Sequence, residues 1–312
     1  MLEVFFLTLF AVSTLLIYIS IGYFLRRHHD LPDDAGHVLS LLCTLVFSPS
    51  YSIINLSKNF TADVIGEKMV ILGYGVVFVA VAFGLAFLLS KPFCKDKAEH
   101  SSLIYAFSIP NYGYFGYPVI QAVFGDAVLA DVMVFLIPLS FATTSIGYVL
   151  FMSGKRIPWR TILLSPMVLA VVIGAGIGIS GIVLPDLVSS ALTGLGNCMS
   201  PASMLLAGFM LGKFPLKKLL SGWRPYYLSA VRLILIPVIF GVILVLSGLK
   251  DIYLMLPLLV TGLPLGLNLV VYPESLGQER VASDNAKLCF ISYLLSIIIL
   301  PCTFAILTYL LQ

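Results

Sequence analysis

Residues 108–118 read Ser-Ile-Pro-Asn-Tyr-Gly-Tyr-Phe-Gly-Tyr-Pro and lie inside an otherwise apolar stretch, residues 101–124. Proline removes a backbone donor and clashes with the carbonyl group four residues earlier. Glycine adds backbone freedom. Two prolines and two glycines within these eleven residues therefore predict a helix that is interrupted part-way along its length.

The composition around this stretch is that of a membrane protein. The chain has 312 residues, of which 60% are hydrophobic and 11% are charged, and its mean hydropathy is +1.05. Soluble domains carry about 25% charged residues, so lipid must solvate much of this chain.

Unwound backbone in lipid costs several kcal/mol for each unsatisfied group, and it persists only where protein or a wet cavity covers it.

Membrane-crossing helices need about 20 apolar residues each, and the sequence contains ten such stretches. They cover residues 4–25, 36–56, 68–90, 101–124, 128–152, 161–181, 184–212, 225–248, 252–272 and 284–311. None shows the period-two alternation of a β-barrel strand. We therefore expect an all-α membrane protein with ten transmembrane helices.

The basic residues predict the orientation of these helices. The even-numbered loops hold three basic residues, Lys58, Lys68 and Lys250. The odd-numbered loops hold thirteen, namely Arg26, Arg27, Lys91, Lys95, Lys97, Lys155, Arg156, Arg160, Lys213, Lys217, Lys218, Arg224 and Arg280. Because basic loops stay on the cytoplasmic side, we expect a multi-pass protein of the cell membrane with both termini outside.

Prolines in the two halves of the chain recur at nearly constant offsets of 152, 154 and 155 residues. The pairs are Pro49 and Pro201, Pro110 and Pro264, and Pro118 and Pro273. Coincidence among proline-rich membrane helices is the alternative, but neighbouring Ser, Gly and Asn residues recur as well. We expect two repeats, 1–152 and 161–312, joined by a short cytoplasmic linker, 153–160. Because each repeat has five helices, the two would be inverted relative to each other, as in many secondary transporters.

The ninth stretch, 252–272, has an interruption of its own, with Gly262, Pro264, Gly266 and Asn268 close together. The two interruptions are expected to face each other inside the bundle, because lipid cannot satisfy their backbone groups. Half-helix N-termini with free N–H groups suit a carboxylate. The candidate substrate-binding residues are Asn111, Tyr112, Gly113, Gly266 and Asn268. The alternative for each Asn is that it caps its own broken helix.

Three charged residues near the predicted helices have specific interpretations. Arg232 lies about eight residues, roughly 12 Å, into the eighth stretch. It could pair with a substrate carboxylate or a protein acid, or it could snorkel toward the cytoplasmic headgroups. Asp126 and Asp131 flank the fifth stretch on the outside and are expected to be solvated.

These motifs resemble those of the auxin efflux carrier family of membrane transporters. The similar segments are Pro110-Asn111 with Gly116-x-Pro118, Leu263-Pro264-x-Gly266, Ser48-Pro49-Ser50, Ser200-Pro201-Ala202-Ser203 and Leu300-Pro301. The resemblance implies that helices four and nine cross at Pro110 and Pro264, with the substrate beside the crossing. It also implies a scaffold of helices 1, 2, 6 and 7, a homodimer through helices 2 and 7, and a moving unit of helices 3–5 and 8–10. Family substrates are organic anions such as auxin in plants and malate-like or malonate-like dicarboxylates in bacteria.

The sequence therefore favours a secondary transporter that moves a small organic anion, a carboxylate, by elevator-like alternating access. A channel-like uniporter of the same fold, or a carrier of a non-anionic metabolite, is the alternative. An enzyme or a sensor is disfavoured, because the sequence offers no clustered acid, base or metal ligands at membrane depth and no nucleotide-binding motif. The expected partners are the lipid bilayer and the anion, without nucleic acid, cofactor or metal.

Overall fold

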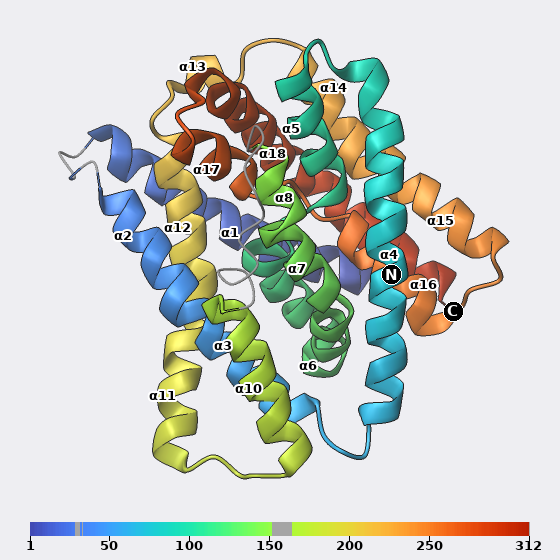
Figure 1. The fold of residues 1–312 in the computed structure, drawn as a ribbon. Coiled ribbons are helices and arrows are strands. Elements are labelled where there is room, and N and C mark those ends of the chain that lie inside the picture. Colours follow the sequence, from blue (N-terminus) through green and yellow to red (C-terminus); the bar gives the residue numbers. More distant parts are fainter. Residues whose placement is uncertain (29–31, 33, 152–163, 312) are drawn as a thin grey trace.

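The computed structural model describes residues 1–28, 32, 34–151 and 164–311, and Figure 1 shows its fold. Within these ranges the regular structure is helical, apart from one isolated β-bridge between two residues. The predicted all-α class is therefore confirmed. The predicted linker, residues 153–160, lies outside the described residues.

The N-terminal half folds into a series of helices that includes two π-helical segments and one short 3-10 helix. Its elements are α1 (Leu2–His28), α2 (Ala35–Leu42), π-helical η1 (Cys43–Phe47), α3 (Ser48–Asn59), α4 (Ile65–Ser90), η2 (Lys91–Phe93), α5 (Lys97–Ser108), π-helical η3 (Tyr112–Gly116), α6 (Tyr117–Phe135), α7 (Ile137–Thr144) and α8 (Ile146–Val149).

The C-terminal half is also helical and contains a third π-helical segment. Its elements are α10 (Pro166–Ser180), α11 (Asp186–Asn197), α12 (Met199–Leu211), α13 (Leu216–Leu219), α14 (Arg224–Ala230), π-helical η4 (Val231–Leu235), α15 (Ile236–Leu246), α16 (Asp251–Thr261), α17 (Asn268–Ser275) and α18 (Glu279–Leu310).

Among the residues that the structure describes, seven helical runs are long and apolar enough to cross a membrane, by length and composition. They are Leu2–His28, Ala35–Asn59, Ile65–Phe93, Tyr112–Phe135, Asp186–Leu211, Arg224–Leu246 and Glu279–Leu310. This number is smaller than the ten membrane helices expected from the sequence, because some of the apolar stretches contain only short helices. The stretch 252–272 holds α16 and α17, and 161–181 holds α10. Gly125, with φ 83° and ψ 178°, kinks the run from Tyr112 to Phe135 close to the predicted boundary between helices four and five.

Each π-helical segment directly precedes a helix that has a proline in its first turn. Pro49 follows η1, Pro118 follows η3 and Pro237 follows η4. A proline inside a regular helix clashes with the carbonyl group four residues earlier. A π turn widens the helix there and removes the clash. The prolines therefore mark these three local distortions in the sequence.

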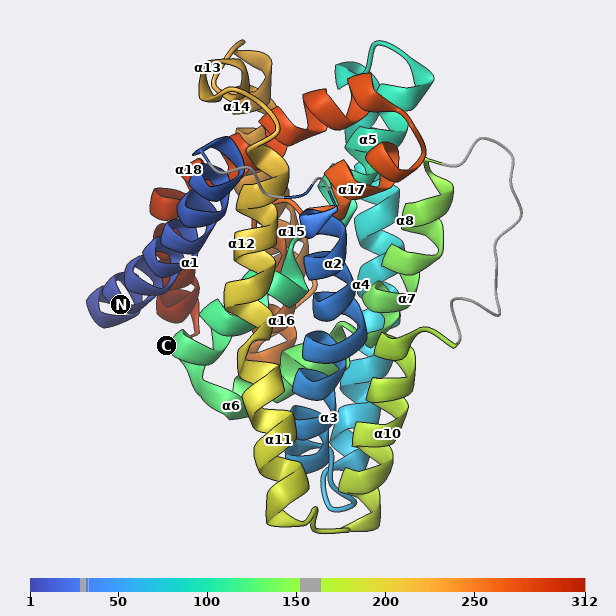
Figure 2. The same cartoon turned by 90° about the vertical axis from the view of Figure 1, so that its left-hand side faces the viewer.

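The helices pack as two groups that meet at α1, which contacts α6 and α18 as well as α12. In Figure 2, α2 and α3, α10, and α11 and α12 run side by side in nearly the same direction, and α1 packs on α12. Small residues allow the close approach of α10 to α3, because a Cβ atom at Gly178 would lie 2.5 Å from the carbonyl oxygen of Phe60. The second group comprises α4 with α5 and α6, and α18 with α14 and α17.

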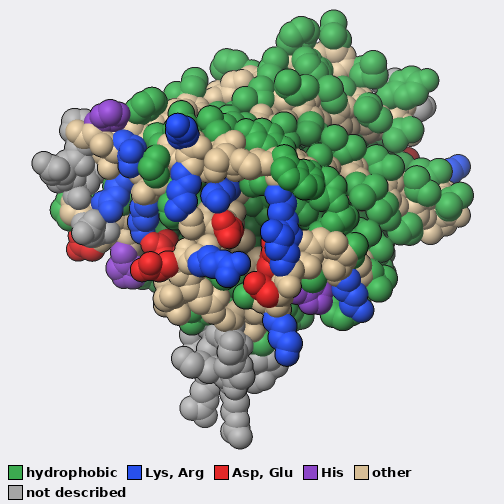
Figure 3. Space-filling view, turned by 90° about the horizontal axis from the view of Figure 1, so that it is seen from above, with side chains coloured by type: hydrophobic (Ala, Val, Ile, Leu, Met, Phe, Trp, Pro, Cys, Tyr) green, Lys and Arg blue, Asp and Glu red, His purple; other side chains and the backbone are tan. Residues whose placement is uncertain are grey.

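Charged side chains gather at one end of the molecule. Figure 3 looks onto this end and shows Lys and Arg side chains interspersed with Asp and Glu, while hydrophobic side chains cover the neighbouring surface. Exposed basic residues between α4 and α5, in α13 and at the start of α18 belong to it, namely Lys95, Lys217, Lys218 and Arg280. The two chain termini lie near each other in both ribbon views (Figures 1 and 2).

Candidate functional site

Two interrupted segments meet in the interior. Helix α5 ends at Ser108 and helical structure resumes at Tyr112, while α16 ends at Thr261 and α17 begins at Asn268. Each gap contains one of the two prolines singled out in the sequence. Four helix ends therefore come together within a few residues of these prolines, two of them C-terminal and two N-terminal.

The two gaps lie against each other as a short antiparallel contact, which we call the crossing (residues 109–111 and 264–266). Pro110 and Leu265 form the isolated β-bridge, and the Asn111 N–H donates to the Pro264 carbonyl oxygen at 2.8 Å. Asn111 is 4% exposed and Leu265 is 1% exposed. A Cβ atom at Gly266 would lie 3.4 Å from the Pro110 carbonyl oxygen. One backbone N–H of the crossing is thus satisfied by a carbonyl group from the other half of the chain.

Side chains of helix α18 form hydrogen bonds with both sides of the crossing. The Ser292 hydroxyl accepts from the Leu265 N–H at 3.3 Å, and the Tyr293 hydroxyl accepts from Asn111 Nδ2 at 3.1 Å. Both α18 residues are almost fully buried, and the Tyr293 ring stacks on Phe115 of η3 at 5.9 Å with an interplanar angle of 8°. One helix therefore holds the orientation of both interrupted segments.

The buried Arg232 caps the C-terminal end of α16 with a hydrogen bond. Its Nη1 donates to the Thr261 carbonyl oxygen at 2.6 Å, and the residue is 1% exposed. The alternative that Arg232 snorkels toward the headgroups is wrong, because its side chain points inward. Its Nε has no hydrogen-bond partner, and no acidic side chain pairs with it, among the described residues. A cation at the negative end of a helix dipole is favourable.

The start of η3 differs from the rest of the crossing because it borders open space. Tyr112, Gly113 and Tyr114 are half-buried, and a Cβ atom added at Gly113 would have no heavy atom within 4 Å. The N–H groups in the first turn of a helix have no partner within that helix. The Tyr112 hydroxyl lies 3.3 Å from Ser140 Oγ. Polar backbone and free volume therefore occur together at this position.

Asn268 lies on the other interrupted segment, at the first residue of α17. It is half-buried, and its Nδ2 donates to the Tyr272 hydroxyl at 3.3 Å, one turn further along the same helix. The Asn268 side chain also hydrogen-bonds the Tyr105 hydroxyl of α5, on the other interrupted segment, whereas the Asn111 side chain is bound to α18. The two predicted asparagines therefore have different environments in the structure.

The chain is similar to one protein family and to one individual protein from an archaeon. Residues 7–157 and residues 150–304 both match the membrane transport protein family. The chain belongs to this family of membrane transporters. The predicted membership of the auxin efflux carrier family is thereby confirmed. A protein of Methanocaldococcus jannaschii named as an uncharacterized transporter is 31% identical over 149 residues, which cover 46% of this chain and 47% of that relative.

In this membrane transport protein, side chains from distant helices satisfy backbone groups that proline leaves free. Pro257 cannot donate to the Tyr253 carbonyl group four residues earlier, and the Tyr74 hydroxyl of α4 donates to that oxygen at 2.7 Å. Tyr74 carries no signal in the sequence for this role. Its position in an apolar span gives no sign of which carbonyl group it would reach.

The same arrangement occurs in α17. Pro273 leaves the Leu269 carbonyl group without its helical donor, and Asn285 of α18 donates to it at 2.7 Å. Asn285 Nδ2 also lies 3.2 Å from Ser102 Oγ of α5. The sequence did carry a signal here, because Asn285, Cys289, Ser292 and Ser296 follow helical spacing along one face of the last apolar stretch.

The structure corrects the expectation for one acidic residue. Asp131 is 9% exposed and forms an ion pair with Lys68 of α4, which is 8% exposed. Asp131 is therefore not solvated, whereas Asp126 is exposed and accepts from Gln121 Nε2 at 2.8 Å. The kink at Gly125 separates the two and turns the following segment inward.

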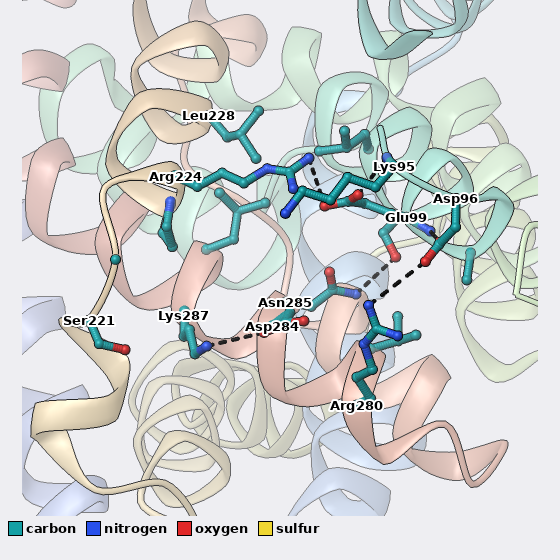
Figure 4. Close-up of a pocket in the computed structure, with 17 residues that line it drawn as sticks. Lys95, Asp96, Glu99, Ser221, Arg224, Leu228, Arg280, Asp284, Asn285 and Lys287 are labelled. Carbon is teal, nitrogen blue, oxygen red and sulfur yellow. Dashed lines mark hydrogen bonds and ion pairs between the residues drawn. The ribbon is translucent and has the colours of Figure 1, made fainter. Parts of the chain in front are cut away.

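A cavity of about 310 Å³ opens at the charged end and lies apart from the crossing. Figure 4 shows that basic and acidic side chains alternate around it, with Arg224 near Glu99 and Lys287 near Asp284, at 2.8 and 3.1 Å. None of the residues predicted to bind substrate lines this cavity. Its cations are largely neutralised by neighbouring acids, so it does not form a strong anion site.

Proposed function

We propose that the protein is a secondary transporter that moves a small organic anion carrying a carboxylate group by alternating access. The crossing is the observation that carries this proposal. Two half-helix N-termini and the Asn111 amide converge there on buried backbone, with free volume beside Gly113. Free N–H groups at a helix N-terminus favour a carboxylate.

The proposed architecture has ten membrane helices in two inverted repeats of five, 1–152 and 161–312. In this arrangement α5 and η3 with the first part of α6 form helix four, and α16 with α17 forms helix nine. The proposal is supported by the antiparallel contact between Pro110 and Leu265, because inverted repeats bring equivalent segments together near the membrane centre.

The electrostatics favour an anion over a cation at this position. Both C-terminal helix ends at the crossing repel an anion, but Arg232 already covers the α16 end through Thr261. The N-terminal ends of η3 and α17 each carry about half a positive charge, which together outweigh the C-terminal end of α5. We propose Asn111, Tyr112 and Gly113 as the main substrate contacts, with Gly266 and Asn268 completing the site.

The moving unit is proposed to contain α4–α8 and α14–α18, and the scaffold α1–α3 and α10–α12. Contacts within the scaffold support this division, since α3 contacts α10 and α11, and α12 contacts α1 and α2, while α1 also packs on α6 and α18 of the moving unit. A homodimer through helices 2 and 7 is part of this proposal, as the family resemblance implies. Relative sliding of the two units would give an elevator-like cycle.

The proposed location is the cell membrane, with both termini outside. This follows from the positive-inside rule, and the gathering of exposed Lys and Arg side chains at one end of the molecule (Figure 3) supports it. Reaction of single cysteines placed at Lys217 and at Lys250 with an impermeant thiol reagent tests the orientation in intact cells. Labelling of the first position alone would overturn it.

Uptake into proteoliposomes tests the function. We expect saturable uptake of radiolabelled malate or indole-3-acetate by the wild-type protein, and a large loss with Asn111→Ala and with Pro110→Ala. Tyr309→Phe, at a position 66% exposed near the end of α18, is the matched control. Normal uptake by both Asn111→Ala and Pro110→Ala would show that the crossing is not the site.

A uniporter of the same fold is the second candidate, and one observation favours it. Among the described residues the buried acidic side chain is Asp131, and it is already paired with Lys68. Ion coupling by a free buried carboxylate thus has no evident residue in this part of the chain. Uptake measured with and without proton and sodium gradients separates the candidates, since a uniporter equilibrates its solute without accumulating it.

A further inference from the structure

The amide of Asn111 has one hydrogen bond that fixes its direction. Nδ2 carries two N–H donors, and the Tyr293 hydroxyl takes one of them at 3.1 Å. Among the described residues no second partner of this amide nitrogen is found. The remaining N–H belongs to a residue next to the half-buried start of η3 and the open space at Gly113.

Tyr293 is itself held so that its hydroxyl cannot move far. Its ring is 1% exposed and is stacked on Phe115, which is fully buried. The adjacent Ser292 binds the Leu265 N–H on the opposite side of the crossing. The terminal torsion of an Asn side chain is broad and roughly two-fold. Without the Tyr293 hydroxyl, the Asn111 amide would therefore rotate among several directions.

We propose that Tyr293 is a positioning residue that orients the Asn111 amide so that its second N–H faces the transported anion. This inference rests on the proposed function, because it needs a solute at the crossing. Tyr293 acts through Asn111 and does not touch the solute. Its loss would therefore weaken binding, while the movement of the loaded protein would keep its rate.

The experiment is a double-mutant cycle on the full-length protein in proteoliposomes, with Tyr293→Phe, Asn111→Ala and the double variant, and with radiolabelled malate and indole-3-acetate as probes. Tyr293→Phe keeps the ring stack with Phe115 and removes one oxygen atom. We expect the half-saturating concentration to rise about three- to tenfold with an unchanged maximal rate. Tyr309→Phe on the same helix should match the wild type.

The coupling between the two positions is the decisive readout. In the Asn111→Ala background, Tyr293→Phe should change the half-saturating concentration by less than about twofold, because the amide that it orients is absent. A purely structural role would instead lower the unfolding temperature of Tyr293→Phe and leave the half-saturating concentration unchanged.

The outcomes separate the two proposals. Uptake of neither probe by the wild type would overturn the proposed function and this inference with it. Uptake that falls in Asn111→Ala but stays normal in Tyr293→Phe would overturn the inference alone. Effects of the two substitutions that simply multiply in the double variant would also overturn it.

Discussion

Gly113 and Gly116 lie three residues apart in η3 and should respond in opposite ways to the same added methyl group. A Cβ atom at Gly116 would lie 2.5 Å from Leu263 Cδ1, whereas one at Gly113 would meet nothing within 4 Å. Carbon atoms in contact normally lie about 3.5–4.0 Å apart. Leu263 is fully buried and has little room to withdraw.

The expected magnitudes follow from these distances. Overpacking costs about 1–3 kcal/mol, and Ala in place of Gly returns up to about 1 kcal/mol in a helix. Gly116→Ala should therefore lose about 1–2 kcal/mol of unfolding free energy. Gly113→Ala should keep or slightly raise stability, but its methyl group would enter the proposed solute space. We expect its half-saturating concentration to rise about tenfold or more.

Two measurements on each purified variant test this prediction. Apparent unfolding temperatures are compared at one heating rate, because membrane proteins often unfold irreversibly. Uptake of radiolabelled malate and indole-3-acetate gives the half-saturating concentrations. The reasoning is refuted if Gly113→Ala transports like the wild type, since the open space would then hold no solute. Equal destabilisation by both substitutions would refute the packing difference.

Two further predictions concern buried polar groups. Tyr74→Phe should lower the unfolding free energy by about 1–3 kcal/mol, because it leaves the Tyr253 carbonyl group without a donor. The loss should be smaller in a Pro257→Ala background, where residue 257 regains an N–H. Thermal unfolding of the wild type, the two single variants and the double variant checks this. Lys68→Met should lower the unfolding free energy by about 3–5 kcal/mol, because Asp131 stays charged and buried. Adding Asp131→Leu should restore most of this stability. An unfolding temperature that does not rise in the double variant would argue against the ion pair.

The fold class and the family could be predicted from composition and from the proline motifs. The apolar fraction predicted a helical membrane protein, and the order of the proline motifs predicted the family; both are confirmed. Length and composition give seven membrane-crossing runs among the described residues, and not the expected ten, because α10 and α16 are short and Gly125 kinks α6. The roles of Asn111, Tyr112, Gly113, Gly266 and Asn268 in binding stay predictions.

Some parts of the site could not be predicted because they depend on residues far apart in the chain. Asn111 and its partner Tyr293 are separated by 182 residues, and Tyr74 and the Tyr253 carbonyl group by 179. Asp131 resembled a solvated residue between two spans, but the kink at Gly125 places it beside Lys68. Local spacing carries no information on such pairs.

The sequence by itself determined that lipid surrounds this protein and that proline leaves particular carbonyl groups without helical donors, because both properties belong to single residues and short segments. Only the tertiary structure decided which side chain reaches each of these carbonyl groups: Tyr74 for Tyr253 and Asn285 for Leu269. The physical reason is that a buried hydrogen bond needs its two partners within about 3 Å, and packing of the whole bundle sets that distance.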